Sequence, residues 1–286
     1  MYGVKWIVKY LTGTDIAGRS LAVYPDDTFI VSYPRSGNTW TRFLVANLLH
    51  PGEPATFLNI ERWVPDSEAQ SSRYLKRIPR PRVIKSHQYF DHRFKKVVYI
   101  VRDPRDVALS YYDFHRKYRQ IPDGYPLTKF VSDFVAGHLI SAWGTWAENV
   151  GSWIYTRHGQ PGFLLLRYED MVANTERELG KIDIFLGTNA TPQILAETVH
   201  RSSAECLRNL ERVQADQWVS TKNKRSDIPF VRTALVGEFR TKLPENAVAE
   251  IESAWAPLIV KLGYDLVTAN PATLTLSRLG SHRERS

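Results

Sequence analysis

Tyr33-Pro-Arg-Ser-Gly-Asn-Thr-Trp40 has the pattern of a phosphate-binding turn between a strand and a helix. The preceding residues 28–32 are a short apolar, β-branched run, which predicts a buried strand. Apolar residues recur behind the turn at helical spacing, so we expect a helix to begin at Asn38 or Thr39. Such a turn directs several unpaired N–H groups to one point, at the positive end of the helix dipole. An anion is expected there.

The residue types within this turn support the same interpretation. Gly37 lets the backbone approach a ligand closely, and Arg35 adds a fixed positive charge. Short polar side chains that can donate hydrogen bonds follow on both sides of the glycine: Ser36, Asn38 and Thr39. The alternative is an ordinary strand-to-helix connection in which glycine and serine only form a turn.

The composition is that of a globular chain with a basic balance. The 286 residues, 43% hydrophobic and 24% charged, suit one large α/β domain, and no apolar run approaches the length of a membrane span. We expect no secretory signal in residues 1–9. The single Cys206 excludes an internal disulfide, and together these features predict a cytoplasmic location. The net charge of +8 favours an acidic partner, either a phosphorylated cofactor, a nucleic acid or an anionic surface.

A second strand-to-helix junction follows the β-branched run 96–101. Asp103 is a good N-cap, and Pro104 suits the first position of a helix. Arg102 stands at the end of the strand and Ser110 lies on the face of the helix that Asp103 and Asp106 share. This junction is a second candidate anion site, unless Arg102 merely pairs with a neighbouring aspartate.

A third strand, 82–87, ends in Lys85-Ser86-His87. Open α/β sheets place their ligands at the carboxyl edge, where this ending would deliver a cation, a hydroxyl and an imidazole. A single histidine more often has a structural role, so His87 taken alone is a weak catalytic candidate.

The rest of the chain alternates strands with helices. We expect two helices within 127–157, a strand at 162–168, a helix ending near Gly187 whose capping box is Thr175 with Glu178, and a final helix at 244–262. This rhythm predicts a single α/β domain with a central parallel sheet flanked by helices. Residues 1–27 would form an irregular lead-in, 28–265 the domain, and 266–286 a disordered basic tail.

The two junctions together resemble those of the cytosolic-type sulfotransferases. Tyr33–Trp40 is similar to their 5′-phosphosulfate loop, and Val101–Tyr112 is similar to their 3′-phosphate motif. The similarity continues through Lys85-Ser86-His87, residues 130–153 and Tyr168-Glu169-Asp170. It covers roughly residues 28–265, with the motifs in the correct order.

The resemblance implies transfer of a sulfuryl group from 3′-phosphoadenosine 5′-phosphosulfate (PAPS) to a hydroxyl or amine of a small-molecule, lipid or glycan acceptor. Under it, His87 is the general base, and Lys85 and Arg35 stabilise developing charge. The implied cofactor-binding residues are Arg35, Ser36, Gly37, Asn38, Thr39, Trp40, Arg102, Ser110, Tyr168, Ser202 and Arg232. It implies no metal ion and no nucleic-acid partner.

The chain departs from the family pattern at four places. Arg35 stands where lysine is usual, Arg232-Thr233-Ala234 replaces an Arg-Lys-Gly element, and Ala204 replaces an aromatic residue that would face Trp40 across the adenine. No copy of the family's dimerisation motif is recognisable near the C-terminus. Cofactor affinity and oligomeric state are therefore left open by the sequence.

Two rival functions and the acceptor also stay open. A P-loop small-molecule kinase would need a second glycine and a Lys-Ser/Thr pair, which this loop lacks. A nucleic-acid-binding protein is suggested by the charge and by the basic cluster 115–119. Loops 51–82 and 219–240 would form the acceptor walls, with Trp63, Tyr89, Phe90 and Phe134 as apolar residues.

Overall fold

Four parallel strands form one sheet in the computed structural model, which describes residues 12, 15–139, 142–232 and 234–268. The strands are β1 (Thr28–Ser32), β2 (Val83–Ser86), β3 (Lys96–Val101) and β4 (Phe163–Arg167), in the order β2-β1-β3-β4. Each strand coincides with a run that the sequence predicted, and the α/β fold with a central parallel sheet is confirmed.

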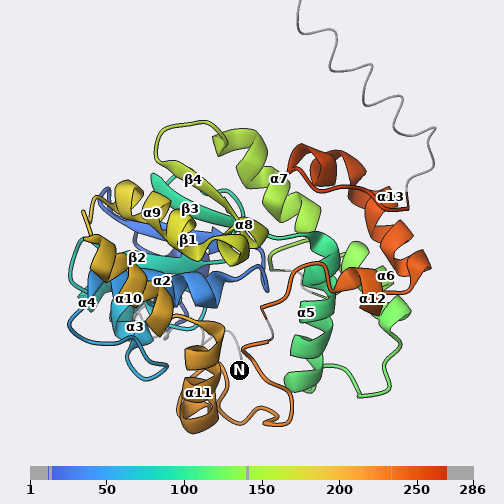
Figure 1. Cartoon of the computed structure of the whole chain (residues 1–286), viewed down its shortest axis with the longest axis horizontal. Coiled ribbons are helices and arrows are strands. Elements are labelled where there is room, and N and C mark those ends of the chain that lie inside the picture. The colour runs from blue at the N-terminus through green and yellow to red at the C-terminus, as the bar shows by residue number, and fades with distance from the viewer. Residues whose placement is uncertain (1–11, 13–14, 140–141, 233, 269–286) are drawn as a thin grey trace, which may run out of the picture.

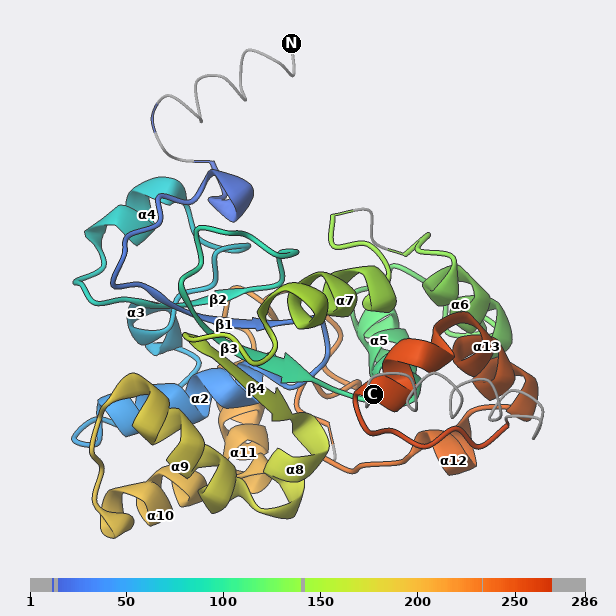
Figure 2. The ribbon, with the colours of Figure 1, turned by 90° about the horizontal axis from the view of Figure 1, so that it is seen from above.

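Helices cover both faces of the sheet (Figures 1 and 2). Alternate side chains of one strand enter different cores, because Phe29 and Val31 pack into one cluster and Ile30 into the other. Helices of the first core are α5 (Pro104–Lys117), α6 (Leu127–Val135), α7 (Trp146–Arg157) and α13 (Glu245–Lys261). Helices of the second are α2 (Asn38–Leu49), α9 (Thr175–Leu186), α10 (Pro192–Arg201) and α11 (Ala204–Gln214).

The register of the sheet aligns the ends of all four strands. Val31 pairs with Ser86 and Ser32 with Ile100, while Val101 pairs with Arg167. The next residue of every strand therefore emerges at the same carboxyl edge. These residues are Tyr33, His87, Arg102 and Tyr168.

The predicted helix starts are confirmed at two junctions and wrong at a third. The helix α2 begins at Asn38, and Asp103 caps α5 by accepting a hydrogen bond from the Arg105 N–H, with Pro104 next. The expected capping box of Thr175 with Glu178 does not form. Asn174 caps α9 instead, because the helix already includes Thr175 and the Asn174 side chain accepts from the Arg177 N–H.

The long loop 50–82 contains the short helices α3 (Ile60–Trp63) and α4 (Ser72–Arg77). Its central part runs beside β2, where the Ser67 N–H donates to the Lys85 carbonyl at 3.0 Å and the Lys85 N–H to the Pro65 carbonyl at 2.9 Å. This pairing holds Asp66 and Glu68 beside the end of β2.

The remaining elements are η1 (Gly18–Ser20) in the lead-in, α8 (Tyr168–Ala173) after β4, and α12 (Phe239–Lys242). Residues 1–11, 13 and 14 of the lead-in and almost all of the tail predicted as disordered lie outside the described residues. Among the helices that the structure describes, none has the length and apolar character needed to cross a membrane.

Candidate active site

A cavity of about 450 Å³ lies at the carboxyl edge of the sheet. Residues that follow each of the four strands line it, together with α5, the loop 50–82 and the loop 219–240. Those predicted from the sequence are Arg35, Gly37, Asn38, Thr39, Trp40, Lys85, His87, Arg102, Ser110, Tyr168 and Arg232. Ser36 and Ser202 are not among the lining residues.

The loop after β1 is held in a conformation that requires glycine at its centre. Gly37 has a φ of 98°, and a Cβ atom there would lie 2.5 Å from the Cδ2 of Tyr168. Arg35 also has a positive φ, 68°, in the left-handed region that side chains rarely adopt. This backbone places the guanidinium group inside the cavity, where its Nε donates to the Ser110 Oγ at 3.1 Å.

Arg35 lies between two aromatic rings. Its guanidinium carbon is 5.2 Å from the ring centre of Phe114 and 4.8 Å from that of Phe230, and its Nη2 donates to the Phe230 carbonyl at 3.3 Å. Burial lowers the pKa of Arg35 to about 10, so the group stays charged at neutral pH. The cation of the loop therefore points inward.

His87 has a fixed tautomer. Its Nδ1 lies 2.7 Å from the carbonyl oxygen of Ser32, which can only accept, so Nδ1 carries the proton and Nε2 keeps its lone pair. Trp143 packs against the imidazole edge to face, with ring centres 5.3 Å apart. Burial, and then the charge of Lys85, lower the pKa of His87 to about 3. A free imidazole titrates near neutral pH, but burial beside a cation lowers the pKa of His87 well below that range.

Lys85 forms a buried ion-pair cluster with two carboxylates. Its Nζ is 3.0 Å from Asp66 and 3.1 Å from Glu68. Glu68 also accepts hydrogen bonds from the Ser86 hydroxyl and the His87 main-chain N–H, both at 3.0 Å. Burial raises the pKa of Glu68, but Lys85 and these bonds outweigh it, and the net shift is downward. Sequence reasoning missed both carboxylates.

Arg102 lies at the second junction, where it contacts an aromatic ring, two carbonyl groups and a carboxylate. Its guanidinium lies 4.2 Å over the Tyr168 ring and donates to the carbonyl oxygens of Arg35, at 3.4 Å, and Leu235, at 3.2 Å. The distance to the Asp106 carboxylate is 3.8 Å. Arg102 thus pairs with Asp106, as the alternative interpretation has it, but at a long distance and with further contacts to Tyr168 and two carbonyl groups. The shorter aspartate pair at this junction is that of Arg105 with Asp103, at 2.6 Å.

The late arginine also reaches the cavity. Arg232 pairs with Asp113 at 3.0 Å and Glu238 at 3.2 Å. Ala234 lines the cavity with a φ of 58°, where a glycine would be unstrained, and Thr233 lies outside the described residues. Ala204 is also a lining residue.

Ser202 supports the cavity from behind its wall. It is fully buried, and its carbonyl accepts a hydrogen bond from the Trp40 indole N–H at 3.0 Å. The Ser202 hydroxyl oxygen accepts from Asn47 at 3.0 Å. The structure thus places Ser202 as an anchor for Trp40.

The comparisons with known proteins match this geometry. The family model described as the sulfotransferase domain matches residues 25–262. The chain belongs to the sulfotransferase family. Sulfotransferase 1B1 of Canis lupus familiaris is 30% identical over 76% of this chain and 77% of its own length, and that of Mus musculus is 30% identical over 81% and 82%. The resemblance to cytosolic-type sulfotransferases is confirmed, and neither the kinase nor the nucleic-acid-binding alternative is supported.

Solved structures share the fold of this sulfotransferase. Retinol dehydratase in complex with androsterone and the inactive cofactor PAP has a TM-score of 0.73 and 20% identity, covering 92% of this chain and 88% of that one. A mouse sulfotransferase complexed with PAP has a TM-score of 0.67 and 23% identity, covering 85% and 88%.

The polar groups of this sulfotransferase fit an anionic nucleotide. Three buried polar atoms at the two junctions have no hydrogen-bond partner in the described structure: Ser36 Oγ, Asn38 Oδ1 and Arg102 Nε. Native proteins rarely leave such atoms unpaired, and Asn38 and Arg102 line the cavity, so these two atoms favour a ligand site there. The described residues contain no group of three or more side chains that could hold a metal ion.

The aromatic walls of the sulfotransferase differ from those expected. Trp63, Tyr89, Phe90 and Phe134 do not line the cavity. Trp63 stacks on His50, and Phe134 belongs to the core of the first sheet face. Besides Trp40 and Tyr168, the aromatic residues that line the cavity are Tyr111, Phe114, Tyr118, Trp143, Trp218 and Phe230. Phe114 and Tyr118 follow Ser110 by one and two helical turns, a spacing that could have identified them.

Proposed function

We propose that this chain transfers a sulfuryl group from PAPS to a hydroxyl of a small-molecule acceptor, with His87 as general base. The observation that carries the proposal is the fixed tautomer of His87, which leaves the lone pair on Nε2 in a residue that lines the same cavity as Arg35 and Lys85. The reaction needs a base, cations and sites for two phosphates, and this cavity is lined by a histidine, Arg35, Lys85 and residues of two strand-to-helix junctions.

Two sets of residues would hold the cofactor. Those at the first junction, Arg35 to Thr39, would bind the 5′-phosphosulfate, with Trp40 and Tyr168 against the adenine. Arg102, Ser110 and Arg232 would bind the 3′-phosphate. When bound, PAPS supplies the sulfuryl group and a phosphate leaving group. The PAP complexes of proteins with the same fold support PAPS as the cofactor.

His87 would remove the proton of the acceptor hydroxyl. Its lowered pKa keeps the imidazole neutral at working pH, so the base is in the correct form before the acceptor arrives. A pKa near 3 makes a weak base, but an anion bound beside the imidazole raises its pKa. Ser32 fixes the ring through Nδ1, which keeps Nε2 available for the proton.

Lys85 and Arg35 would stabilise negative charge that develops as the bond to the leaving oxygen breaks. Arg35 can donate through two N–H groups at once. Lys85 begins from a cluster with Asp66 and Glu68, so it would have to share its charge between these carboxylates and the reacting group. The cluster also fixes the position of Lys85 before the cofactor binds.

The acceptor would be a small molecule with an apolar body. The aromatic side chains of the cavity, which include Phe114 and Trp143, suit a ring system. Similar folds have been crystallised with androsterone and with retinol, which supports a hydroxyl-bearing acceptor of this kind over a glycan.

The proposal includes a cytoplasmic location, which the single cysteine supports.

The proposal also includes the limits of the catalytic domain. The family match over 25–262 supports a catalytic unit of about residues 28–265. Limited proteolysis of the whole chain tests these limits, because cleavage should concentrate outside that range.

A direct assay tests the activity. The chain is incubated with sulfate-labelled PAPS and a pool of hydroxyl compounds, and the products are detected by mass. A gain of one sulfuryl group on an acceptor, together with release of PAP, is the expected result. Release of PAP without any sulfated acceptor would contradict the proposed transfer.

A further inference from the structure

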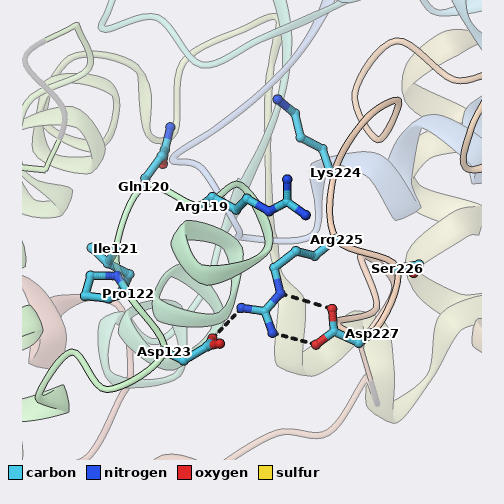
Figure 3. Close-up of a pocket in the computed structure, with 9 residues that line it drawn as sticks. All are labelled: Arg119, Gln120, Ile121, Pro122, Asp123, Lys224, Arg225, Ser226 and Asp227. Carbon is cyan, nitrogen blue, oxygen red and sulfur yellow. Dashed lines mark hydrogen bonds and ion pairs between the residues drawn. The ribbon is translucent and has the colours of Figure 1, made fainter.

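A second cavity, of about 700 Å³, opens beside the first. Two segments line it: residues 119–123, which follow α5, and residues 224–227 of the loop 219–240 (Figure 3). Lys224 lines both cavities. We call the first the inner cavity and the second the outer cavity; the shared lysine makes them neighbours along one wall.

The two segments around the outer cavity are tied together by buried contacts. Lys117, which is 3% exposed, donates from Nζ to the carbonyl oxygens of Arg225 at 2.8 Å and Ile228 at 2.6 Å. Tyr118 donates its hydroxyl to the Ser220 carbonyl. The loop 219–240 is therefore fixed to the end of α5, and the outer cavity has a formed wall before any ligand binds.

The charges of the outer cavity do not balance. Arg225 is held between Asp123 and Asp227, with both carboxylates within ion-pair distance (Figure 3). Arg119 and Lys224 have no carboxylate partner among the described residues. Figure 3 shows these two side chains on the same side of the cavity, away from Asp123. With three cations and two carboxylates, the lining has a net charge of +1, and Arg119 and Lys224 are the two cations that remain for a ligand.

Local structure positions both cations at this place. Arg119 has a φ of 56° at the end of α5, a conformation for which glycine would be unstrained. The Lys224 ammonium lies 4.8 Å over the ring of Tyr118, which itself lines the inner cavity. Lys224 is thus held at the boundary of the two cavities, where it would contact a ligand that extends from the inner cavity into the outer one.

We propose that the outer cavity is the far end of the acceptor site and that it takes acceptors carrying an anionic group, such as a carboxylate, sulfate or phosphate, remote from the hydroxyl that is sulfated. This inference rests on the proposed function, which places the hydroxyl at His87. The aromatic body of such an acceptor would lie against Phe114 and Tyr118, and its anion would meet Lys224 and Arg119.

The test compares matched acceptors that differ in charge and length. The probes are ω-(4-hydroxyphenyl)alkanoic acids with short and long alkyl chains, each paired with its neutral primary amide. Dissociation constants are measured with PAP present, and kcat/KM with PAPS. The parent should prefer the long acid to its amide roughly three- to tenfold, the effect of one or two partly exposed ion pairs. The short acid should show no preference, because its carboxylate does not reach the outer cavity.

Variants then test whether Arg119 and Lys224 cause the preference for the long acid over its amide. The double variant Arg119→Gln, Lys224→Gln should lower the acid-to-amide ratio for the long pair to about one. The control variant Lys222→Gln changes an exposed lysine of the same loop that lines neither cavity, and it should keep the ratio of the parent. A preference that persists in the double variant, or equal binding of the long acid and its amide by the parent, would overturn the inference.

The binding ratio separates this inference from the proposed function. If no acceptor is sulfated, the transfer proposal fails, while the acid-to-amide ratio of dissociation constants still decides whether the outer cavity recognises an anion. The preference should also shrink as salt is added, because Arg119 is exposed. A preference that does not change with salt would contradict electrostatic recognition.

Discussion

The Nε of Arg35 donates a hydrogen bond to the Oγ of Ser110, 3.1 Å away, and so joins the loop after β1 to the helix after β3. The two strand-to-helix junctions are therefore one structural unit. Arg102 reinforces this unit by donating to the Arg35 carbonyl. A ligand that binds at one junction is in contact with groups positioned by the other.

Arg35 is expected to contribute to the transition state through charge and not through proton transfer. Its pKa of about 10 leaves it protonated, and the leaving phosphate oxygen is a weak base that needs little protonation. Arg35→Ala should lower kcat by roughly a hundredfold to a thousandfold, the scale seen when one preorganised donor is removed. Arg35→Lys should keep substantial activity. The test is kcat of both variants, measured at saturating PAPS. A kcat of Arg35→Ala within about threefold of the parent value would show that Arg35 has no part in the transition state.

The 3′-phosphate should be the main source of cofactor affinity. The buried Nε of Arg102 has no hydrogen-bond partner in the described structure, and the Asp106 carboxylate is 3.8 Å from the guanidinium, so a phosphate would supply a closer partner. Charge-assisted hydrogen bonds to such a phosphate contribute roughly 1.5 to 3 kcal/mol each. PAP should therefore bind far more tightly than adenosine 5′-monophosphate, and Arg102→Gln should reduce this difference. Similar dissociation constants of the two nucleotides, measured by calorimetry, would contradict the assignment.

Removal of divalent cations should leave the activity intact. Arg35, Lys85 and the N–H groups of the loop after β1 supply the positive charge that the reaction needs. The assay is repeated after treatment with EDTA, with added magnesium as the comparison. Activity that disappears with EDTA and returns with magnesium would show that a cation takes part in the transfer.

The sheet and its carboxyl edge could be predicted because their signals are local. The β-branched run 96–101 and the polar ending Arg102-Asp103-Pro104 adjoin in sequence, and each alone indicates a strand or a helix start. Parallel strands then bring their ends together by geometry. This is why His87, Arg35 and Arg102 could be placed in one site without any knowledge of distances.

The parts that could not be predicted depend on contacts far apart in sequence. Glu68 meets His87 because the loop 50–82 runs beside β2, and no periodicity marks that loop. The pKa of His87 depends on burial and on Lys85, neither of which a single histidine in a sequence reveals. The Ser202 hydroxyl accepts a hydrogen bond from Asn47, a residue 155 positions away, so its role could not be predicted from the local sequence.

His87→Ala should abolish turnover while nucleotide affinity stays nearly unchanged, because the base acts on the acceptor. Loss of a general base typically costs a factor of about a hundred or more in rate. His92→Ala is the matched control, since His92 is exposed and does not line the cavity. The assay compares kcat and the dissociation constant of PAP for both variants; near-normal turnover of His87→Ala would refute the assignment of the base.

Two buried imidazoles should make the fold sensitive to acid. Burial lowers the pKa of His115 to about 4, and burial with Lys85 lowers that of His87 to about 3. Unfolded histidine titrates near 6.5, so below this pH the unfolded chain binds more protons than the folded one. The free energy of unfolding should therefore fall as pH decreases from about 6.5 towards 4, by about 1.4 kcal/mol per pH unit for each proton at most. Stability from these groups is fully present above 6.5.

The contribution of His115 can be isolated by removing its titration. His115 packs against the rings of Tyr111 and Phe130, and its Nε2 has no partner in the described structure. His115→Phe keeps an aromatic ring at this position, so it should weaken the dependence of unfolding free energy on pH between about 6.5 and 4. His92→Phe changes an exposed histidine and should leave the slope as in the parent. Urea unfolding at a series of pH values gives the slopes, and equal slopes for His115→Phe and the parent would mean that His115 already binds its proton in the folded chain.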